Sequence, residues 1–537
     1  MKPRKIEFAF FFVVVLLINT ALQYFWGAQT SELWHTDDGS HYISGTLIQE
    51  WIRSGFPNPL SFAYDFNAHF PIVGIGLWGP AFYVIEGVWQ LVFGASKGAA
   101  FMLSAAVAAL TSTIIYAISK VRCGTIAAAC FAAAFSMLPL GFEGIVSYGL
   151  DLPVALFCLL SALAFARYLA SERRGGLVLF GFFAIFCLFI KGNGLALGLF
   201  VPLAILLGQR FRVFLKLSLW LAGALIIAIA LPWYLLTFKM SASGFRHAWG
   251  IEFFLMALPQ NIRLVTGTLG VFLVPLLLLG IVRTLRDTRD LLGRVVLALF
   301  LAVFLFQSLV PASLNGRYLL PLLAPALILC ADGWSFVWQF VVRTSPRLEK
   351  PLLGLGPVAF FASLLLLTYL SPRGNHGLIE AARVVTAQPQ FDGKSVLIAS
   401  FDVGETAFIA EMAMALDGRP SAYVIRGSRL LGGGGYNNFE YSTPYNSVEE
   451  VAERLASFKI PYLVISTEGR AKEWKHVTLL DEMLHTPGKG WVLLWRYDGP
   501  KDVRVYGNPA FAQVRADHAK IRALTQPKKM GSVTDGK

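Results

Sequence analysis

Long apolar runs alternate with short polar segments over the first two thirds of the chain. A helix that crosses a bilayer needs about 20 mostly apolar residues. Windows of this kind occur at 8–26, 73–93, 99–119, 125–141, 152–170, 214–236, 264–282, 293–312, 318–341 and 352–370, and the stretch 177–208 has the pattern of two short spans around a break. The pattern therefore predicts a polytopic α-helical membrane domain over residues 1–372, with about 11 to 13 transmembrane helices. We expect the first window to be a membrane anchor and not a signal peptide, because no small-residue cleavage site follows its long apolar run.

The pattern changes after Leu370, where polar residues become frequent. Residues 373–513 alternate strand-like runs with amphipathic helical runs, which predicts an α/β domain. The strand-like runs are 395–402, 422–427, 461–467 and 491–498, and the helical runs are 404–416 and 447–458. The glycine run Gly432–Gly435 lacks the strand-to-helix context of a phosphate-binding loop and is expected to be a flexible loop. Residues 514–537 form a polar tail.

Composition supports the membrane assignment. The chain has 537 residues, of which 56% are hydrophobic and only 15% charged, and this is more apolar surface than one soluble core could bury. The net charge is +13, but the basic residues gather in short segments between apolar runs, as positive-inside clusters do, so nucleic-acid binding is not needed to explain them. These clusters place the N-terminus in the cytoplasm and the α/β domain outside it.

One conflict remains in this topology. Counting from a cytoplasmic N-terminus, the windows 73–93 and 99–119 would put Lys120 and Arg122 on the wrong side of the membrane. Either one of these two windows does not cross fully, or a crossing has been missed.

The five cysteines lie in or beside apolar runs, and none lies in the α/β domain. They are Cys123, Cys130, Cys158, Cys187 and Cys330. We expect small buried side chains and no disulfides that support the α/β domain. No thiol-based metal motif occurs in the sequence.

Polar residues with possible chemistry lie in the segments expected on the extracytoplasmic face. Asp37 and Asp38 occur in the run WHTDDGSHY, within a predicted outer loop over residues 28–72. A carboxylate at a membrane surface can orient or deprotonate an acceptor, and cationic groups can hold a leaving phosphate as negative charge develops on it. Further polar positions on this face are His69, Asp151, Lys191, Arg317 and Tyr318.

Six short motifs follow one another in an order typical of a known superfamily. They are DDGSHYISGTLIQEW (37–51), HFPIVGIGLWGPAFY (69–83), YGLDLP (148–153), FIKGNG (189–194), LPWY (231–234) and GRYLLPLLAP (316–325). In this order the chain resembles the GT-C glycosyltransferases, which use polyprenyl-phosphate-linked sugars, and above all the branch of the aminoarabinose lipid A transferases and protein O-mannosyltransferases. In the aminoarabinose branch an outer C-terminal α/β domain also occurs.

The resemblance implies roles for individual residues. Asp37 matches the first acid of the family's acidic pair and is the expected catalytic residue, with Asp38 beside it. The implied donor- or phosphate-binding residues are His69, Asp151, Lys191, Arg317 and Tyr318, where His69 stands in place of a common lysine. Ala68 and Phe253 occupy positions where some relatives have acidic and histidine metal ligands. No metal site and no required cofactor are therefore predicted, and dependence on a divalent metal is left as an alternative.

Each of these residues also has a plainer interpretation. Asp37 and Asp38 could cap a helix, or His35, Asp37 and His41 could bind a metal in one loop. Asp151 could cap the helix that it opens, and Lys191 could extend toward the membrane interface. His69 could simply pack within its loop.

Together with the resemblance, these observations predict a glycosyltransferase in the bacterial inner membrane, active at the periplasmic face, and the resemblance implies that it inverts the anomeric centre. Its partners would be a polyprenyl-phosphate-linked sugar donor, a lipid, glycan or protein acceptor, and the bilayer, without nucleic acid. One alternative is a flippase for lipid-linked sugars, which would place ionisable residues deep within spans and show inverted repeats. The other is a non-catalytic component of envelope assembly, in which Asp37 would be replaceable.

Overall fold

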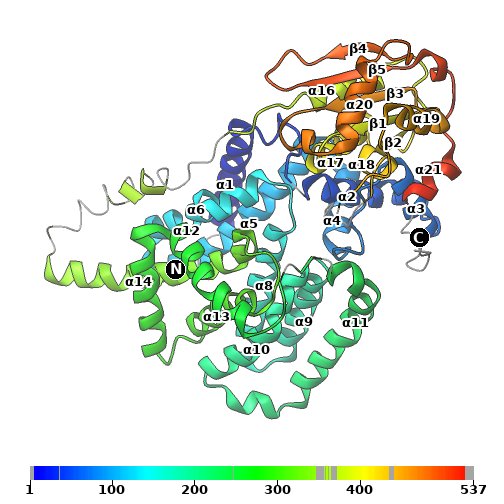
Figure 1. The fold of residues 1–537 in the computed structure, drawn as a ribbon. Helices are drawn as coiled ribbons and strands as arrows, with labels where there is room; N and C mark the ends of the chain where they lie inside the picture. The colour runs from blue at the N-terminus through cyan, green and yellow to red at the C-terminus, as the bar shows by residue number, and fades with distance from the viewer. Residues whose placement is uncertain are drawn as a thin grey trace. The chain divides into compact units, whose positions relative to one another are not determined.

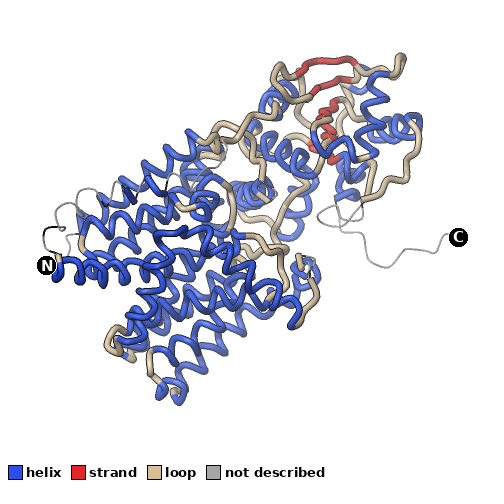
Figure 2. The backbone as a smooth tube through the Cα atoms, turned by 60° about the vertical axis from the view of Figure 1, so that its left-hand side comes forward, coloured by secondary structure: helices blue, strands red, loops and turns tan. Residues whose placement is uncertain are grey.

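The computed structural model describes residues 5–35, 37–242, 244–245, 247–345, 347, 356, 359–360, 362–364, 372–433 and 441–525 (Figures 1 and 2). It divides into two compact units. The helical unit comprises Met1–Trp26, Ile75–Phe82 and Phe101–Pro372, and the α/β unit comprises Gly27–Gly74, Tyr83–Ala100 and Arg373–Lys537. All strands of the described part belong to the α/β unit, as the red segments in Figure 2 show. The predicted fold class, a polytopic helical domain followed by an α/β domain, is confirmed.

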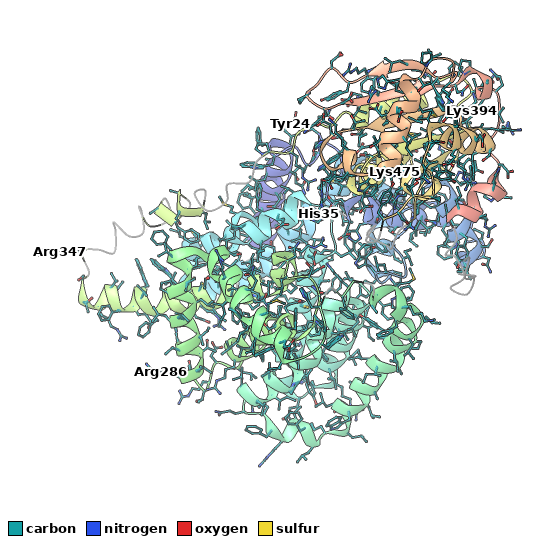
Figure 3. The ribbon with its side chains drawn as sticks, viewed as in Figure 1. Tyr24, His35, Arg286, Arg347, Lys394 and Lys475 are labelled. Carbon is teal, nitrogen blue, oxygen red and sulfur yellow. The ribbon has the colours of Figure 1, made fainter. Side chains whose placement is uncertain are left out.

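The helical unit consists of apolar helices joined by short turns. These are α1 (Lys5–Phe25), α5 (Lys97–Cys123), α6 (Thr125–Met137), α7 (Pro139–Val146), α8 (Asp151–Ser171), α9 (Arg174–Leu188), α10 (Ala196–Leu207), α11 (Leu217–Ala242), α12 (Ile251–Arg286), α13 (Leu291–Leu309) and α14 (Leu323–Thr344). Three 3-10 helices connect them: η1 (Gly192–Leu195), η2 (Phe211–Leu215) and η3 (Gly316–Leu322). Figure 3 shows Arg286 at the end of α12, in one of the basic clusters that set the predicted topology.

Seven helices of the described part are long and apolar enough to cross a membrane, or eight if the bent pair α6 and α7 counts as one span. This count is lower than the predicted 11 to 13 because three apolar segments, at 81–93, 174–188 and 192–207, form helices of only 10–17 residues. Helices α9 and α10 nevertheless form the two short apolar elements around a break that the stretch 177–208 predicted. The window 352–370 lies largely outside the described residues.

The apolar window 73–93 does not form a full span. Its helix, α4 (Ala81–Phe93), has 13 residues. At 1.5 Å per residue such a helix is about 20 Å long, shorter than the roughly 30 Å of a hydrocarbon core. From Tyr83 onward the segment belongs to the α/β unit. A short α4 agrees with the first of the two alternatives, that one of the windows before Lys120 does not cross fully.

The α/β unit is built on a five-stranded sheet. The strands are β1 (Ser395–Ala399), β2 (Tyr423–Arg426), β3 (Tyr462–Ser466), β4 (Val492–Arg496) and β5 (Val503–Gly507), in the order β2-β1-β3-β5-β4. Strands β2, β1 and β3 are parallel, with Val396 of β1 paired to Val424 and Tyr462, whereas β5 is antiparallel to β3 and β4. Helix α16 (Leu378–Thr386) precedes β1, and the later helices are α17 (Asp402–Ala415), α18 (Gly427–Leu430), α19 (Val448–Phe458), α20 (Lys475–His485) and α21 (His518–Thr525). A core that includes Leu397, Leu463 and Leu480 holds this sheet to its helices.

The predicted outer loop 28–72 is largely helical. It contains α2 (Asp38–Arg53) and α3 (Pro59–His69), and both belong to the α/β unit. Helix α2 is buried along most of its length because it packs against α17. Gly39 allows this approach, since a Cβ atom there would lie 2.7 Å from the carbonyl oxygen of Thr406.

Candidate active site

Three predicted residues of the helical unit come together from three separate elements. Asp151 is the first residue of α8, Lys191 lies in the turn between α9 and η1, and Tyr318 lies in η3. The Lys191 Nζ donates a hydrogen bond to Asp151 Oδ1 at 2.6 Å. The same Nζ lies 4.6 Å from the centre of the Tyr318 ring, within the range of a cation–π interaction.

Arg317 joins this cluster from the neighbouring position. Its guanidinium carbon lies 5.2 Å from the centre of the Tyr318 ring. The first turn of η3 is fixed by Asn315, whose side-chain oxygen accepts the Arg317 backbone N–H at 3.1 Å. Four of the predicted site residues, listed here, therefore form one cluster: Asp151, Lys191, Arg317 and Tyr318.

The cluster contains one buried ion pair and a further basic side chain. Asp151 and Lys191 are 7% and 9% exposed, and the ion pair between them is neutral overall. Lys191 is thus held in the interior and does not extend away along a helix surface. Arg317 adds a second basic side chain to the cluster, and a planar guanidinium can bind a phosphate through two parallel hydrogen bonds.

In the α/β unit, the paired acids Asp37 and Asp38 lie at the start of α2 but have different surroundings. Asp38 is 1% exposed; its Oδ2 lies 3.5 Å from the Arg373 guanidinium, and its Oδ1 lies 3.5 Å from the His35 imidazole, labelled in Figure 3. Asp37 is partly exposed and occupies the N-cap position of α2, where its side chain makes no capping hydrogen bond. Capping is therefore not what its carboxylate does, and of the two acids Asp37 is the more accessible to a substrate.

Sequence reasoning missed the side chains that surround this acidic pair, above all Arg373. The one sequence feature that could have pointed to Arg373 is its position, since it is the basic residue that opens the polar region after the last apolar window. Glu32, Trp34 and His376 gave no recognisable pattern, because their partners lie more than 340 residues away along the chain.

His69 lies at the end of α3 and packs against the α/β sheet. Its Nδ1 hydrogen-bonds to the carbonyl oxygen of Ala422 at 2.8 Å, and its ring stacks on Tyr423 at 4.0 Å. Burial lowers the pKa of His69 to about 4, so the imidazole is neutral at pH 7. These contacts match the packing interpretation and supply no positive charge for a phosphate.

Metal ligands are not gathered in the described part of the chain. No group of three or more His, Cys, Asp or Glu side chains there could hold a metal ion. His41, one member of the alternative metal site, is buried, and its Nδ1 hydrogen-bonds with the Tyr83 hydroxyl at 2.8 Å. Ala68 and Phe253, at the altered ligand positions, are buried apolar side chains.

Known proteins share this architecture. Residues 80–236 match the family model described as dolichyl-phosphate-mannose-protein mannosyltransferase. The crystal structure of ArnT from Cupriavidus metallidurans in the apo state matches with a TM-score of 0.62 at 16% identity, over 94% of this chain and 98% of that one. The same protein bound to undecaprenyl phosphate matches with a TM-score of 0.62 at 15% identity, over 95% and 99% of the two chains.

This chain has the GT-C fold. The oligosaccharyltransferase of Archaeoglobus fulgidus, in complex with Zn and sulfate, matches it more distantly, with a TM-score of 0.53 at 15% identity over 93% of this chain and 73% of that one. No curated protein matches the chain in sequence. The GT-C likeness that the six motifs predicted is confirmed by these matches.

Proposed function

We propose that this GT-C chain is a membrane glycosyltransferase that moves a sugar from a polyprenyl phosphate to an acceptor at the extracytoplasmic face. The observation that carries the proposal is the cluster of Asp151, Lys191, Arg317 and Tyr318 at helix ends of a GT-C fold. A cation beside an ion pair and an aromatic ring suits the recognition of a sugar phosphate.

In the proposed reaction the leaving group is the polyprenyl phosphate. The acceptor oxygen attacks the anomeric carbon, the bond from that carbon to the phosphate oxygen breaks, and the acceptor proton passes to the Asp37 carboxylate. A single displacement through an oxocarbenium-like transition state inverts the anomeric centre. Arg317 stabilises the charge that develops on the departing phosphate, and the Asp151–Lys191 pair holds the Tyr318 ring beside it.

Two observations support the donor class and the side of the membrane. The ArnT structure with undecaprenyl phosphate has the same fold, which favours an undecaprenyl-type carrier. The basic clusters between apolar runs favour a cytoplasmic N-terminus and an extracytoplasmic α/β unit in a bacterial inner membrane. The acceptor is a lipid, glycan or protein of the cell envelope, and the transfer requires neither metal nor other cofactor.

The test compares transfer by the wild-type chain and by Asp37→Asn. Mass spectrometry of envelope lipids, glycans and proteins, from cells with and without the chain, first identifies the sugar-bearing product. The purified chain in detergent is then given the lipid-linked sugar fraction and the acceptor fraction of the cells that lack it. We expect product from the wild type and none from Asp37→Asn at equal protein levels.

The control is Asp417→Asn, because the Asp417 side chain is 55% exposed and its φ of 53° is a conformation that asparagine tolerates. Detergent removes the membrane barrier, so a flippase would form no product in this assay. Wild-type transfer by Asp37→Asn would show that the catalytic assignment is wrong.

A further inference from the structure

The segment around the acidic pair lies at the edge of the α/β sheet where such sheets usually bind ligands. In the strand order β2-β1-β3 the chain passes from β1 to β2 on one side and then crosses to β3 on the other side of β1, and the carboxyl ends of parallel strands at such a switch point form a common binding crevice. Here Trp34 packs edge-to-face on Phe401, just beyond β1, with their ring centres 5.5 Å apart. Helix α2 continues from this point along α17. The chain's own acidic segment therefore occupies this edge of the sheet.

Glu32 fastens one end of the acidic segment. Its side chain is fully buried, and its carboxylate accepts the backbone N–H of His376 at 2.9 Å and that of Leu378 at 2.8 Å. Leu378 is the first residue of α16, so the negative charge also lies at the positive end of a helix dipole. Hydrogen bonds to an ionised group are among the stronger ones in proteins.

Two further contacts fasten the rest of the segment to the same stretch of chain. The Trp34 indole stacks on the His376 imidazole, with ring centres 3.5 Å apart and an interplanar angle of 6°. Arg373 lies beside Asp38, at the start of α2. Asp37 is thus flanked by Trp34 and Asp38, and residues 373–378 hold both of these neighbours.

We propose that the part of the α/β unit that begins at Arg373 positions the catalytic carboxylate. In this proposal Glu32 and Arg373 are positioning residues, because their contacts hold the segment that carries Asp37 in its productive place. This inference rests on the proposed function, because it assigns the α/β domain a part in the transfer step itself. The domain need not recognise the acceptor for this role.

The role predicts a loss of rate without a loss of donor binding. Replacing a hydrogen-bond partner of a charged group costs about 1.5–3 kcal/mol, which corresponds to roughly 10- to 150-fold in rate if the whole cost falls on the transition state. We expect Glu32→Ala and Arg373→Met to lower kcat by such a factor and to leave KM for the extracted lipid-linked sugars unchanged. Arg373→Lys retains the positive charge and should recover much of the rate.

Hydrogen–deuterium exchange of the full chain in nanodiscs tests the positioning independently of activity. Residues 33–42 should exchange faster in Glu32→Ala and in Arg373→Met than in the wild type. The matched control is Glu473→Ala, since the Glu473 side chain is 68% exposed, and it should change neither exchange nor rate. The milder variant Glu32→Gln serves if Glu32→Ala does not accumulate.

The outcomes separate the two proposals. Lower kcat together with faster exchange at 33–42 supports the positioning role. Unchanged exchange, or a loss of rate equal to that of Glu473→Ala, overturns it even if the wild type transfers sugar. If the wild type transfers no sugar, the proposed function fails, while faster exchange would still show that Glu32 and Arg373 hold the acidic segment.

Discussion

The buried ion pair between Asp151 and Lys191 gives the sharpest prediction for the helical unit. Both side chains are about one-tenth exposed, at 9% and 10%, and the two charged atoms are 2.6 Å apart. Removing one partner of such a pair leaves an uncompensated buried charge and costs about 3–5 kcal/mol, whereas removing both partners is often close to neutral. Lys191→Met should therefore destabilise the chain by about 3–5 kcal/mol, and the double variant with Asp151→Asn by much less than the sum of the two single variants.

The measurement is a denaturant titration of the four proteins of this double-mutant cycle in one detergent. Lys216→Met is the matched control, because Lys216 pairs with Glu172 near the surface, where the two side chains are 35% and 44% exposed. An exposed pair contributes only about 0–1 kcal/mol. Additive effects of Asp151→Asn and Lys191→Met, or a cost of Lys191→Met equal to that of Lys216→Met, would refute the reasoning.

Two further predictions concern charge in each unit. On the proposed function, the Arg317 guanidinium contacts the donor phosphate, so Arg317→Met should weaken binding of undecaprenyl phosphate by about 10- to 150-fold. The double variant Asp151→Asn/Lys191→Met should bind undecaprenyl phosphate nearly as the wild type does, and native mass spectrometry can measure this binding. If the double variant lost as much affinity as Arg317→Met, Arg317 would not be the residue that provides the charge for the phosphate. For His69, burial sets the folded pKa at about 4, below the unfolded value of about 6.5, so its stability contribution is complete above pH 6.5 and is lost as pH falls toward 4. The free energy of unfolding should therefore fall by about 2 kcal/mol between pH 7 and pH 5. His69→Phe should reduce the difference between the unfolding midpoints at these two pH values. An unchanged difference would show that the proton taken up on unfolding does not bind to His69.

The sequence predicted the helical unit well because its features are local. A transmembrane helix satisfies its own backbone, so an apolar run of sufficient length identifies it without knowledge of its neighbours. Asp151, Lys191 and Arg317 stand at the ends of such runs, and polar residues at helix ends are visible as interruptions in the apolar pattern. The sequence could not reveal that Lys191 is paired with Asp151.

The segment 28–72 was harder to interpret because its structure depends on distant residues. Helix α2 has no apolar stripe that stands out, and its burial is supplied by α17, more than 300 residues later in the chain. His69 gave the same difficulty, since it is held by Ala422 and Tyr423. Local periodicity indicates a helix only when one face alternates clearly with the other, and tertiary packing overrides it here.

The arrangement of the α/β unit along the chain limits when the acidic segment can take its place. The unit combines Gly27–Gly74, Tyr83–Ala100 and Arg373–Lys537, so Asp38 and its partner Arg373 are 335 positions apart. At a synthesis rate of about 5–20 residues per second, this separation corresponds to tens of seconds between the two partners. During this interval Glu32 and Asp38 lack the groups that hold them in the finished protein. The proposed catalytic carboxylate can therefore be held in position only after residues 373–378 have been made and α16 has formed. On this reasoning a chain that carries the complete helical unit, but ends before Arg373, would retain its candidate phosphate-binding cluster and lack a held carboxylate.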